Sequence, residues 1–536
     1  MRRRLITSLA TLAVVASLTA GCTAQSPAES PDASTSSTPA TTGATAAATT
    51  LGVSVEEVLA ANADTTTVNE DEWSAADAVD IALTGTGATP SGDGVAVDGA
   101  TVTITTAGVY RLTGTLAGGI VVAAPDDAQV VLILDGASID NADGPAIQVD
   151  TADDVAIHLA DGSANAVADA ASYAEDAPAD AAIHSTADLT ISGTGALTVE
   201  GRGNNGIASS DDLVVLSGTL TVTAANDALK GKDSLVIEGG TITATAGDDA
   251  LASDKDDDAA KGFVRITGGD ITATADDDGI NATTDIVIEG GTIVIAAGGD
   301  GVHADQILRI AGSELSVTRS EEGLEAADIG ISGGTVSVVA TDDGVNASDG
   351  SGSQAMGGGA PGGQAGTDGV TLEISGGTLV VDAQGDGLDS NGTLTITGGD
   401  VTVHGPSSGG NGTFDADGAF TITGGDLLGL GSSGMAQTPT GTGQAWVAAS
   451  ADIAEGAQVG VTDADATVVA TTTALRTAQF VFYSSPDVAT GQTYTVTVDG
   501  AQAATATEGQ FTGGMGGGPG GQGGMGGGPG GRGGNR

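Results

Sequence analysis

The sequence has few of the residues on which most folded proteins of this length rely. Only one of its 536 residues is cysteine, so no disulfide can form within the chain. Aromatic residues make up 2%, and Lys and Arg together number 15 against 70 Asp and Glu. The formal net charge of −55 repels phosphate, which argues against nucleic acid and anionic membrane surfaces as partners. A core with so few rings must be thin and built from Ala, Val, Ile and Leu.

The N-terminal residues are typical of an export signal. Three arginines precede an apolar stretch at residues 5–20, which is too short to span a bilayer comfortably. Cys22 closes a run of small residues that resembles a bacterial lipobox, in which the cysteine is lipidated. We therefore expect residues 1–21 to be a lipoprotein signal peptide. This predicts an extracellular protein that is held on the outer face of the cell membrane through its lipid alone.

Several segments have compositions that cannot bury enough apolar surface to fold. Residues 22–50 are rich in Ala, Ser, Thr and Pro, which predicts a disordered tether. A Gly-rich run at 350–367 predicts a projecting loop, and the Gly-rich residues 508–536 predict a disordered tail. We expect residues 51–99 to form an N-terminal segment or cap, with a short helical pattern at 55–59.

Between these segments a Gly-Gly pair recurs with a regular spacing. Its first glycine falls at Gly239, Gly268, Gly290, Gly312, Gly333, Gly376, Gly398 and Gly424. The period is therefore 22 residues, with local insertions and one double-length gap that holds the Gly-rich run. Such a period indicates a solenoid, and the Leu-x-x-Leu-x-Leu frame of leucine-rich repeats is missing.

Each repeat contains the two-residue alternation of a β-strand. In the run Thr241–Thr245 the Ile and Ala should face inward and the Thr outward. Three short strands joined by Gly and Asp turns make one coil, and parallel crossovers are nearly always right-handed. We therefore predict an all-β fold, a right-handed single-stranded parallel β-helix over residues 100–440. Alternating segments at 441–507 predict a small C-terminal β cap.

A row of acidic residues stands just before the second turn of the repeats. Because equivalent positions of a β-helix stack in register, these acids should form a ladder along one edge. The row reads Asn205, Asp227, Asp249, Asp278, Asp300, Glu322, Asp343 and Asp386. A second row, three residues further along, reads Lys230, Ala252, Asn281, His303, Glu325, Asn346 and Asp389.

A ladder of carboxylates is unfavourable unless its charge is compensated. Two unit charges about 4.8 Å apart repel by roughly 3 to 4 kcal/mol at an effective dielectric constant of about 20. Calcium binds oxygens at about 2.3 to 2.6 Å, so one ion can bridge acids on adjacent coils. Zinc is disfavoured by the single cysteine and the scattered histidines. The predicted calcium ligands are Asp227, Asp248, Asp249, Asp254, Asp277, Asp278, Asp300, Glu322, Asp343, Asp386 and Asp389.

The acidic residues also allow two simpler interpretations and a catalytic one. Asp before Gly is favourable turn chemistry, and a high negative charge keeps an exported protein soluble. A catalytic role needs a base, and Lys230 and Lys232 beside the acidic row are the candidates for a polysaccharide lyase. Both lysines would also serve simply to compensate the neighbouring acids.

Several stretches resemble a family of bacterial cell-surface carbohydrate-binding β-helix proteins known from cellulolytic clostridia. They are Gly108–Gly114, Val131–Gly136, Asn204–Ser209, Lys230–Asp233, Gly431–Ala436 and Phe482–Asp487. The resemblance implies binding of plant-type polysaccharides, cellulose and polygalacturonate among them, with calcium held in acidic turns. It also implies the fold of pectate lyases without established lyase activity. The chain departs where Ala228 and Ala250 replace the usual turn glycine, and where Ala252 interrupts the second row.

Three functions follow from these features. The first is a calcium-binding, polysaccharide-binding surface lipoprotein that acts as a monomer. The second is a pectate-lyase-like enzyme, and the third is a non-enzymatic structural adhesin. Composition does not reveal the glycan, because the faces of a solenoid bind by shape.

Overall fold

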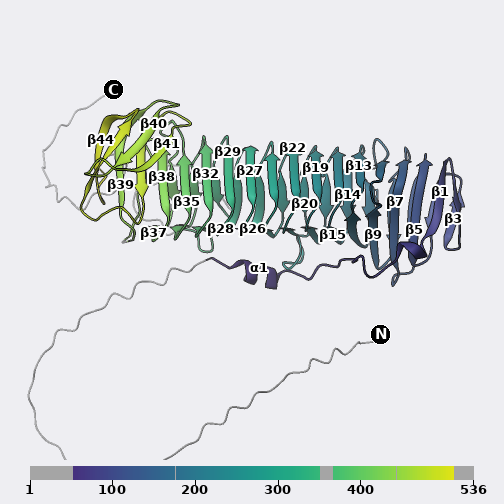
Figure 1. Cartoon of the computed structure of the whole chain (residues 1–536). Helices are drawn as coiled ribbons and strands as arrows, with labels where there is room; N and C mark the ends of the chain where they lie inside the picture. The colour runs from purple at the N-terminus through teal and green to yellow at the C-terminus, as the bar shows by residue number, and fades with distance from the viewer. Residues whose placement is uncertain (1–51, 175–176, 351–365, 442, 512–536) are drawn as a thin grey trace, which may run out of the picture. The chain divides into compact units, whose positions relative to one another are not determined.

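The computed structural model describes residues 52–174, 177–350, 366–441 and 443–511. The expected signal peptide, Cys22, the expected tether, most of the Gly-rich run and nearly all of the tail lie outside the described residues. None of the described helices is long and apolar enough to cross a membrane. The described residues fold into a right-handed parallel β-helix with a small C-terminal β cap, as predicted (Figure 1).

Three faces of stacked parallel strands form the β-helix, and through its middle each strand pairs with the strand three further along the chain. The threonine face comprises β10 (Ala164–Ala168), β13 (Ala196–Gly201), β16 (Thr219–Ala224), β19 (Thr241–Ala246), β22 (Asp270–Ala275), β25 (Thr292–Ala296), β27 (Glu314–Arg319), β29 (Thr335–Ala340), β32 (Thr378–Ala383), β35 (Asp400–His404) and β38 (Asp426–Gly431).

The ladder face follows the threonine face in each coil. It comprises β6 (Gly119–Ala123), β8 (Ile147–Thr151), β11 (Ala181–Ser185), β14 (Asn205–Ser209), β17 (Leu229–Gly231), β20 (Leu251–Ser253), β23 (Ile280–Ala282), the first parts of β26 (Val302–Ile310) and β28 (Leu324–Ile331), β30 (Val345–Ala347), β33 (Leu388–Ser390) and β36 (Phe414–Ala416).

The strap face completes the coil and takes its name from an N-terminal segment that crosses it. It comprises β5 (Gly108–Leu116), β7 (Gln129–Asp140), β9 (Asp154–Leu159), β12 (Asp188–Gly193), β15 (Asp212–Val215), β18 (Ser234–Ile237), β21 (Phe263–Ile266), β24 (Asp285–Ile288), the second parts of β26 and β28, β31 (Thr371–Ile374), β34 (Thr393–Ile396) and β37 (Phe420–Ile422).

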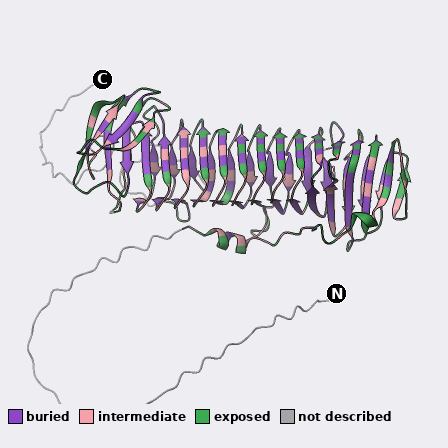
Figure 2. Cartoon of the chain, in the orientation of Figure 1, coloured by how far each residue is buried: buried purple, intermediate pink, exposed green. Residues whose placement is uncertain are grey.

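The core is a narrow column of aliphatic side chains. In β19, Ile242 and Ala244 are buried whereas Thr241, Thr243 and Thr245 are exposed, as the alternation predicts. Buried and exposed residues alternate in the same way along the neighbouring strands (Figure 2). A column of this kind fills the interior without the aromatic residues that the chain lacks.

The Gly-Gly pair closes the turn between the strap face and the threonine face. Its second glycine has a positive φ, 95° at Gly240 and 93° at Gly291, which strains residues with a Cβ. At the first position, a Cβ on Gly268 would lie 2.6 Å from the Glu238 carbonyl oxygen of the preceding coil. The repeat therefore needs glycine for two different reasons.

Insertions enter the β-helix without changing its register. Ile242 pairs with Ile271 because seven extra residues form a loop between β20 and β21. Val336 pairs with Leu379, so the double-length gap in the sequence is one coil that carries the Gly-rich run between β30 and β31.

The N-terminal part consists of a strap and two antiparallel pairings. The strap, residues 52–78, contains α1 (Val55–Ala61) and the 3-10 helix η1 (Ala75–Asp77), and Ser54 and Glu57 form a capping box at the start of α1. The helical pattern expected at 55–59 is thus present. After the strap, β1 (Val79–Gly85) pairs with β2 (Ala88–Pro90), and β3 (Val95–Asp98) pairs with β4 (Thr101–Ile104).

The C-terminal cap covers the last coil with a small aromatic cluster. β42 (Ala478–Ser484) pairs antiparallel with β38 and with β39 (Trp446–Ile453). The Phe482 ring lies 5.3 Å from that of Phe414 and 5.8 Å from that of Trp446. A separate sheet follows, made of β40 (Gln458–Thr462), β41 (Val468–Thr473), β43 (Thr493–Val498) and β44 (Ala501–Thr507).

Candidate metal-binding acid ladder

The predicted acidic row is a continuous ladder at the start of the ladder-face strands. Leu229 of one coil pairs with Leu251 of the next, which pairs with Ile280, so the residues two positions earlier also stack. We call this row the acid ladder. Its members are Asp227, Asp249, Asp278, Asp300, Glu322, Asp343 and Asp386, preceded by Asn205.

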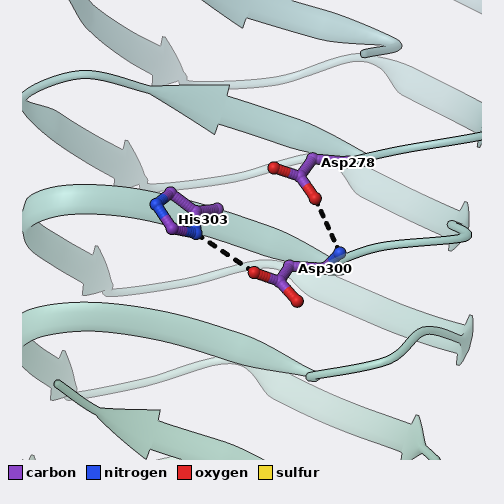
Figure 3. A group of neighbouring side chains, drawn as sticks. All are labelled: Asp278, Asp300 and His303. Atoms are coloured by element: carbon purple, nitrogen blue, oxygen red, sulfur yellow. Dashed lines mark hydrogen bonds and ion pairs between the residues drawn. The ribbon is translucent and has the colours of Figure 1, made fainter. Parts of the chain in front are cut away.

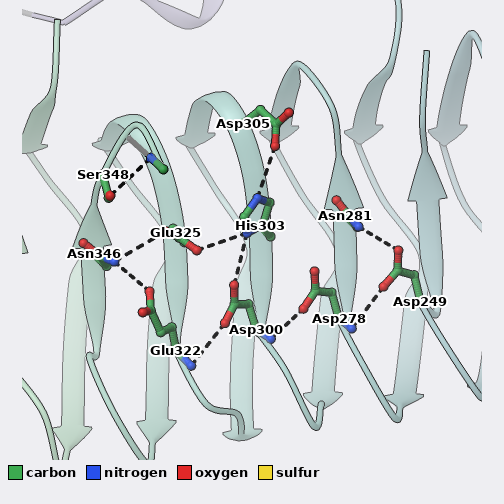
Figure 4. A network of polar contacts seen from close by, with 11 residues as sticks. Asp249, Asp278, Asn281, Asp300, His303, Asp305, Glu322, Glu325, Asn346 and Ser348 are labelled. Carbon is green, nitrogen blue, oxygen red and sulfur yellow. Dashed lines mark hydrogen bonds and ion pairs between the residues drawn. The ribbon is translucent and has the colours of Figure 1, made fainter. Parts of the chain in front are cut away.

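Most ladder carboxylates cap the backbone of the next coil (Figure 4). Asp278 Oδ1 accepts a hydrogen bond from the Asp300 N–H at 2.7 Å, and Asp300 Oδ1 accepts one from the Glu322 N–H at 3.2 Å. Asn205 Oδ1 does the same for the Asp227 N–H at 3.1 Å. An amide oxygen is therefore sufficient for this structural role, which leaves the negative charge of the acids unexplained by turn chemistry.

The second row supplies partners on the outer side of the ladder. The Asn281 amide donates to Asp249 Oδ2 at 2.7 Å, and the Asn346 amide donates to Glu322 Oε2 at 2.8 Å. The other polar atom of the Asn346 side chain, Oδ1, is buried and finds no donor among the described residues. A buried acceptor without a donor, in a row of carboxylates, is an environment that a cation would satisfy.

Groups of acidic residues bring ligand atoms within 4.8 Å of one another along the ladder. Those groups are Asp248, Asp249 and Asp277; Asp278, Asp300 and His303; and Asp300, Glu322 and Glu325. Figure 3 shows the second group, in which Asp278 and Asp300 come from adjacent coils. The first and third offer only oxygen, the ligand type that calcium prefers.

Burial raises the pKa of several of these carboxyls, and the neighbouring acids raise it further. The raised values are about 6 for Asp249 and Asp343, about 7 for Asp278 and Asp386, and about 8 for Glu322 and Asp389. Without a cation, the ladder therefore holds protons near neutral pH that ordinary acids would have released.

Two protein cations already neutralise parts of the ladder. Lys230 Nζ lies 3.0 Å from Asp227 Oδ2 and 2.8 Å from Asp254 Oδ2. His303 Nδ1 lies 3.1 Å from both Asp300 and Glu325, and these contacts raise its pKa to about 11. The ladder acids without either of these cations lie between the two sites and beyond His303 toward the C-terminus.

The predicted ligands divide into three sets. Asp227 and Asp254 are occupied by Lys230, and Asp254 belongs to the inserted loop before β21. Those that meet in close groups are Asp248, Asp249, Asp277, Asp278, Asp300 and Glu322. Asp343 and Asp386 raise the pKa of Asp389, after the larger effect of burial, but the three do not form such a close group within the described chain.

Some acids with the same character were not among the predicted ligands. Glu325 completes the group with Asp300 and Glu322, and Asp415 continues the second row after Asp389. A separate group, Asp188, Asp211 and Asp212, lies where strap-face strands begin. The doubled Asp at the start of β15 was the sequence signal for that group. Asp188 comes from the preceding coil, and only the pairing of Leu189 with Leu213 shows that it lies beside them.

Lys230 does not have the properties of a catalytic base. Its two carboxylate partners outweigh the desolvation that lowers its pKa, so the pKa of Lys230 is raised well above its ordinary value. An elimination needs a base that is unprotonated near neutral pH. Lys232 is exposed on the same turn.

The comparisons with known proteins identify a family and a similar structure. Residues 98–369, just over half of the chain, match the model of a family described as carbohydrate-binding domain-containing proteins. The chain belongs to this family. Among solved structures, it is similar to a polysaccharide lyase-like protein from C. thermocellum, solved as a gadolinium derivative. The two share 37% identity over 44% of this chain and 96% of the other, with a TM-score of 0.43. A search of curated proteins found no match.

The capping role of the ladder predicts a difference between two substitutions at one position. Asp278→Asn keeps an oxygen for the Asp300 N–H, so the calcium-free variant should unfold at the same temperature as the parent or higher. Asp278→Ala leaves that N–H without its acceptor and should lose about 1 kcal/mol. Thermal unfolding in chelator measures both, and equal stability of the two variants would contradict the capping role.

The raised pKa values predict an unusual pH dependence. Carboxyls with a folded pKa of about 6 to 8 stabilise the fold fully below their unfolded pKa, and this contribution is lost as pH rises through the folded value. The melting temperature of the calcium-free chain should therefore fall between about pH 5 and 8. About 1 mM calcium should remove most of the fall, because the ion replaces the protons. A melting temperature that rises over this range without calcium would contradict the ladder's protonation.

Proposed function

We propose that this protein binds acidic polysaccharides through calcium ions held on the acid ladder. Membership of the carbohydrate-binding family establishes the general class of ligand. The observation that carries the finer proposal is the row of closely grouped, mostly half-buried carboxylates. Beside it lies the buried Oδ1 of Asn346, which has no donor among the described residues. These atoms form an oxygen-rich strip that has too few protein cations to neutralise it.

The ladder residues would hold the ion with the oxygens that the backbone does not use. Asp278 gives one oxygen to the Asp300 N–H of the next coil, which leaves its other oxygen available. Asp300 uses one oxygen for the Glu322 N–H, and its other oxygen pairs with His303. Calcium takes six to eight oxygen ligands, so it would bridge these carboxylates to oxygens of a sugar acid. The protein alone would otherwise repel a polyanion, because its own net charge is −55.

The repeating geometry suits a polymer. Coils follow one another at about 4.8 Å, so successive ladder groups present carboxylates along a straight line. A chain of uronic acids also repeats its carboxylates along a line, and several weak contacts would add up to useful affinity. This supports a linear acidic glycan in preference to a single small sugar at the ladder.

A polysaccharide lyase remains the alternative suggested by the fold, but the geometry around Lys230 does not favour it. The lysine is held in two ion pairs and keeps its proton. The structural adhesin remains the second alternative, and it predicts no glycan affinity.

Calorimetry of the chain without its first 22 residues tests the proposal. Calcium should bind, and polygalacturonate should then bind in calcium but not in chelator. The double variant Asp278→Asn with Glu322→Gln should lose glycan affinity at least about tenfold, because charged ligand oxygens are replaced by amides. Asp126→Asn, an exposed acid in a turn away from the ladder, is the matched control and should bind like the parent.

Each contrary result has a defined meaning. Calcium binding without any glycan response would leave the ion as a structural element and reject the binding proposal. Release of unsaturated uronate, followed by ultraviolet absorbance, would favour the lyase.

We also propose that the mature protein is anchored to the outer face of the cell membrane by a lipid on Cys22. The support is the sequence of the N-terminal region alone. Cys22→Ser should move the protein from the membrane fraction to the culture medium, because its anchor is lost. Full retention of this variant in the membrane fraction would contradict the lipid anchor.

A further inference from the structure

The strap creates a cleft at the N-terminal end of the β-helix, on a different face from the ladder. The strap crosses successive coils of the strap face, and Val68 N–H donates to Thr190 Oγ1 at 3.0 Å. Further on, Glu70 and Ala75 lie near residues of β5, β7, β9 and β12. Between them and the sheet lies a cleft of about 400 Å³. Its polar lining includes Glu70, Arg111, Asp135, His158 and Asp161.

The size and lining of this cleft suit a small polar molecule. Small-molecule sites typically measure about 300 to 1,000 Å³, with an apolar part and a few convergent polar groups. Here Ile133 and Ala160 provide the apolar part. Arg111 is held in place by the Ala75 carbonyl at 3.1 Å and by Asp80 at 3.4 Å. The guanidinium thus links the strap to the sheet at the edge of the cleft.

Hydrogen-bond acceptors with spare capacity line the cleft. The Asp135 carboxylate is exposed and accepts no hydrogen bond from the described residues. Among the described residues, the Glu70 carboxylate makes no hydrogen bond, and its Oε1 lies 3.7 Å from His158 Nδ1. Asp161 accepts from Thr194 Oγ1 at 2.6 Å and has its second oxygen left. Such carboxylates can each accept hydrogen bonds from two neighbouring hydroxyl groups.

An aromatic pair forms part of the same region. Trp73 of the strap meets the ring of His158 edge-on, with 4.9 Å between ring centroids. The His158 ring is oriented by Ser192 Oγ at 3.0 Å. His158 lines the cleft, and Trp73 contacts it from a hydrophobic cluster that includes Ile133. A ligand that contacts His158 would therefore change the surroundings of the Trp73 indole.

The charge of the cleft selects between classes of sugar. Three carboxylates, Glu70, Asp135 and Asp161, outnumber the single guanidinium of Arg111. An anionic sugar would therefore be repelled, whereas the hydroxyl groups of a neutral sugar can donate to the carboxylates and accept from Arg111. The acid ladder, by contrast, would take an acidic sugar only through a cation.

We propose that the strap cleft is a second, calcium-independent site that binds one unit of a neutral saccharide. It rests on the proposed function only in taking a saccharide as its ligand. With one site for neutral sugar units and another for acidic ones, the protein could hold mixed glycans in which neutral and acidic segments alternate.

The chain provides its own reporter for this site. It contains two tryptophans, Trp73 and Trp446. Trp446 stacks on Phe482 in the C-terminal cap, so Trp446→Phe leaves Trp73 as the single indole without altering the cleft. Titration of this variant with glucose, galactose, xylose and their β-1,4-linked oligosaccharides, in chelator, should give a saturable change in fluorescence. Galacturonic acid should give a much weaker response.

Two substitutions in the Trp446→Phe background assign the response to the cleft. Asp135→Ala removes an exposed acceptor and should weaken the apparent affinity about tenfold. Asp126→Ala, also exposed but outside the cleft, should bind like its parent. The Asp278→Asn, Glu322→Gln variant should keep this response while it loses calcium-dependent binding of polygalacturonate.

The outcomes separate the two proposals. No fluorescence change with any neutral sugar, or an equal change in Asp135→Ala, overturns the cleft proposal and leaves the ladder untouched. A change caused by calcium alone would identify the cleft as a cation site and would also overturn it. If the parent does not bind polygalacturonate in calcium but keeps its fluorescence response to neutral sugars, the ladder proposal is rejected instead.

Discussion

The structure depends on the parallel stacking of nearly identical coils in strict register. Each coil lies about 4.8 Å from the next, so every side chain has a similar side chain as its neighbour above and below. For Ile and Ala this arrangement is favourable, because a continuous column of aliphatic groups is buried. For Asp it is unfavourable, because like charges are placed side by side. The acid ladder is therefore a direct consequence of the same stacking that builds the core.

The chain reduces this repulsion between carboxylates in three ways, within the ladder and the second row beside it. Lys230 and His303 bring positive charge to two positions, and Asn281 and Asn346 replace acids in the second row. Elsewhere the carboxyls retain protons at a raised pKa. A cation bound to the ladder would take the place of the protons on these carboxyls. Protonation of the ladder is therefore linked to the stability of the β-helix.

The repeating part of the fold could be predicted from the sequence, because a 22-residue period and a two-residue alternation are local patterns. The stacking of Asp249 on Asp278 followed directly from that period, despite the insertion between them. The ion pair of Lys230 with Asp254 could not be predicted, since it depends on how the inserted loop folds back. The path of the strap also could not be predicted from local patterns, because the contact of Val68 with Thr190 joins residues 122 positions apart.

The strap has a mechanical consequence. Gly52 donates to Glu373, Arg309 donates to the Val53 carbonyl, and Thr66 donates to Asp212, so the strap is fastened to one coil after another. A pulling force applied to the chain before residue 52 would reach the β-helix at its side and not at its first strand. These fastenings would have to break in sequence before the load reached β1. The hydrogen bonds of the strap would thus break first under load, and the stacked coils would stay folded until they had broken.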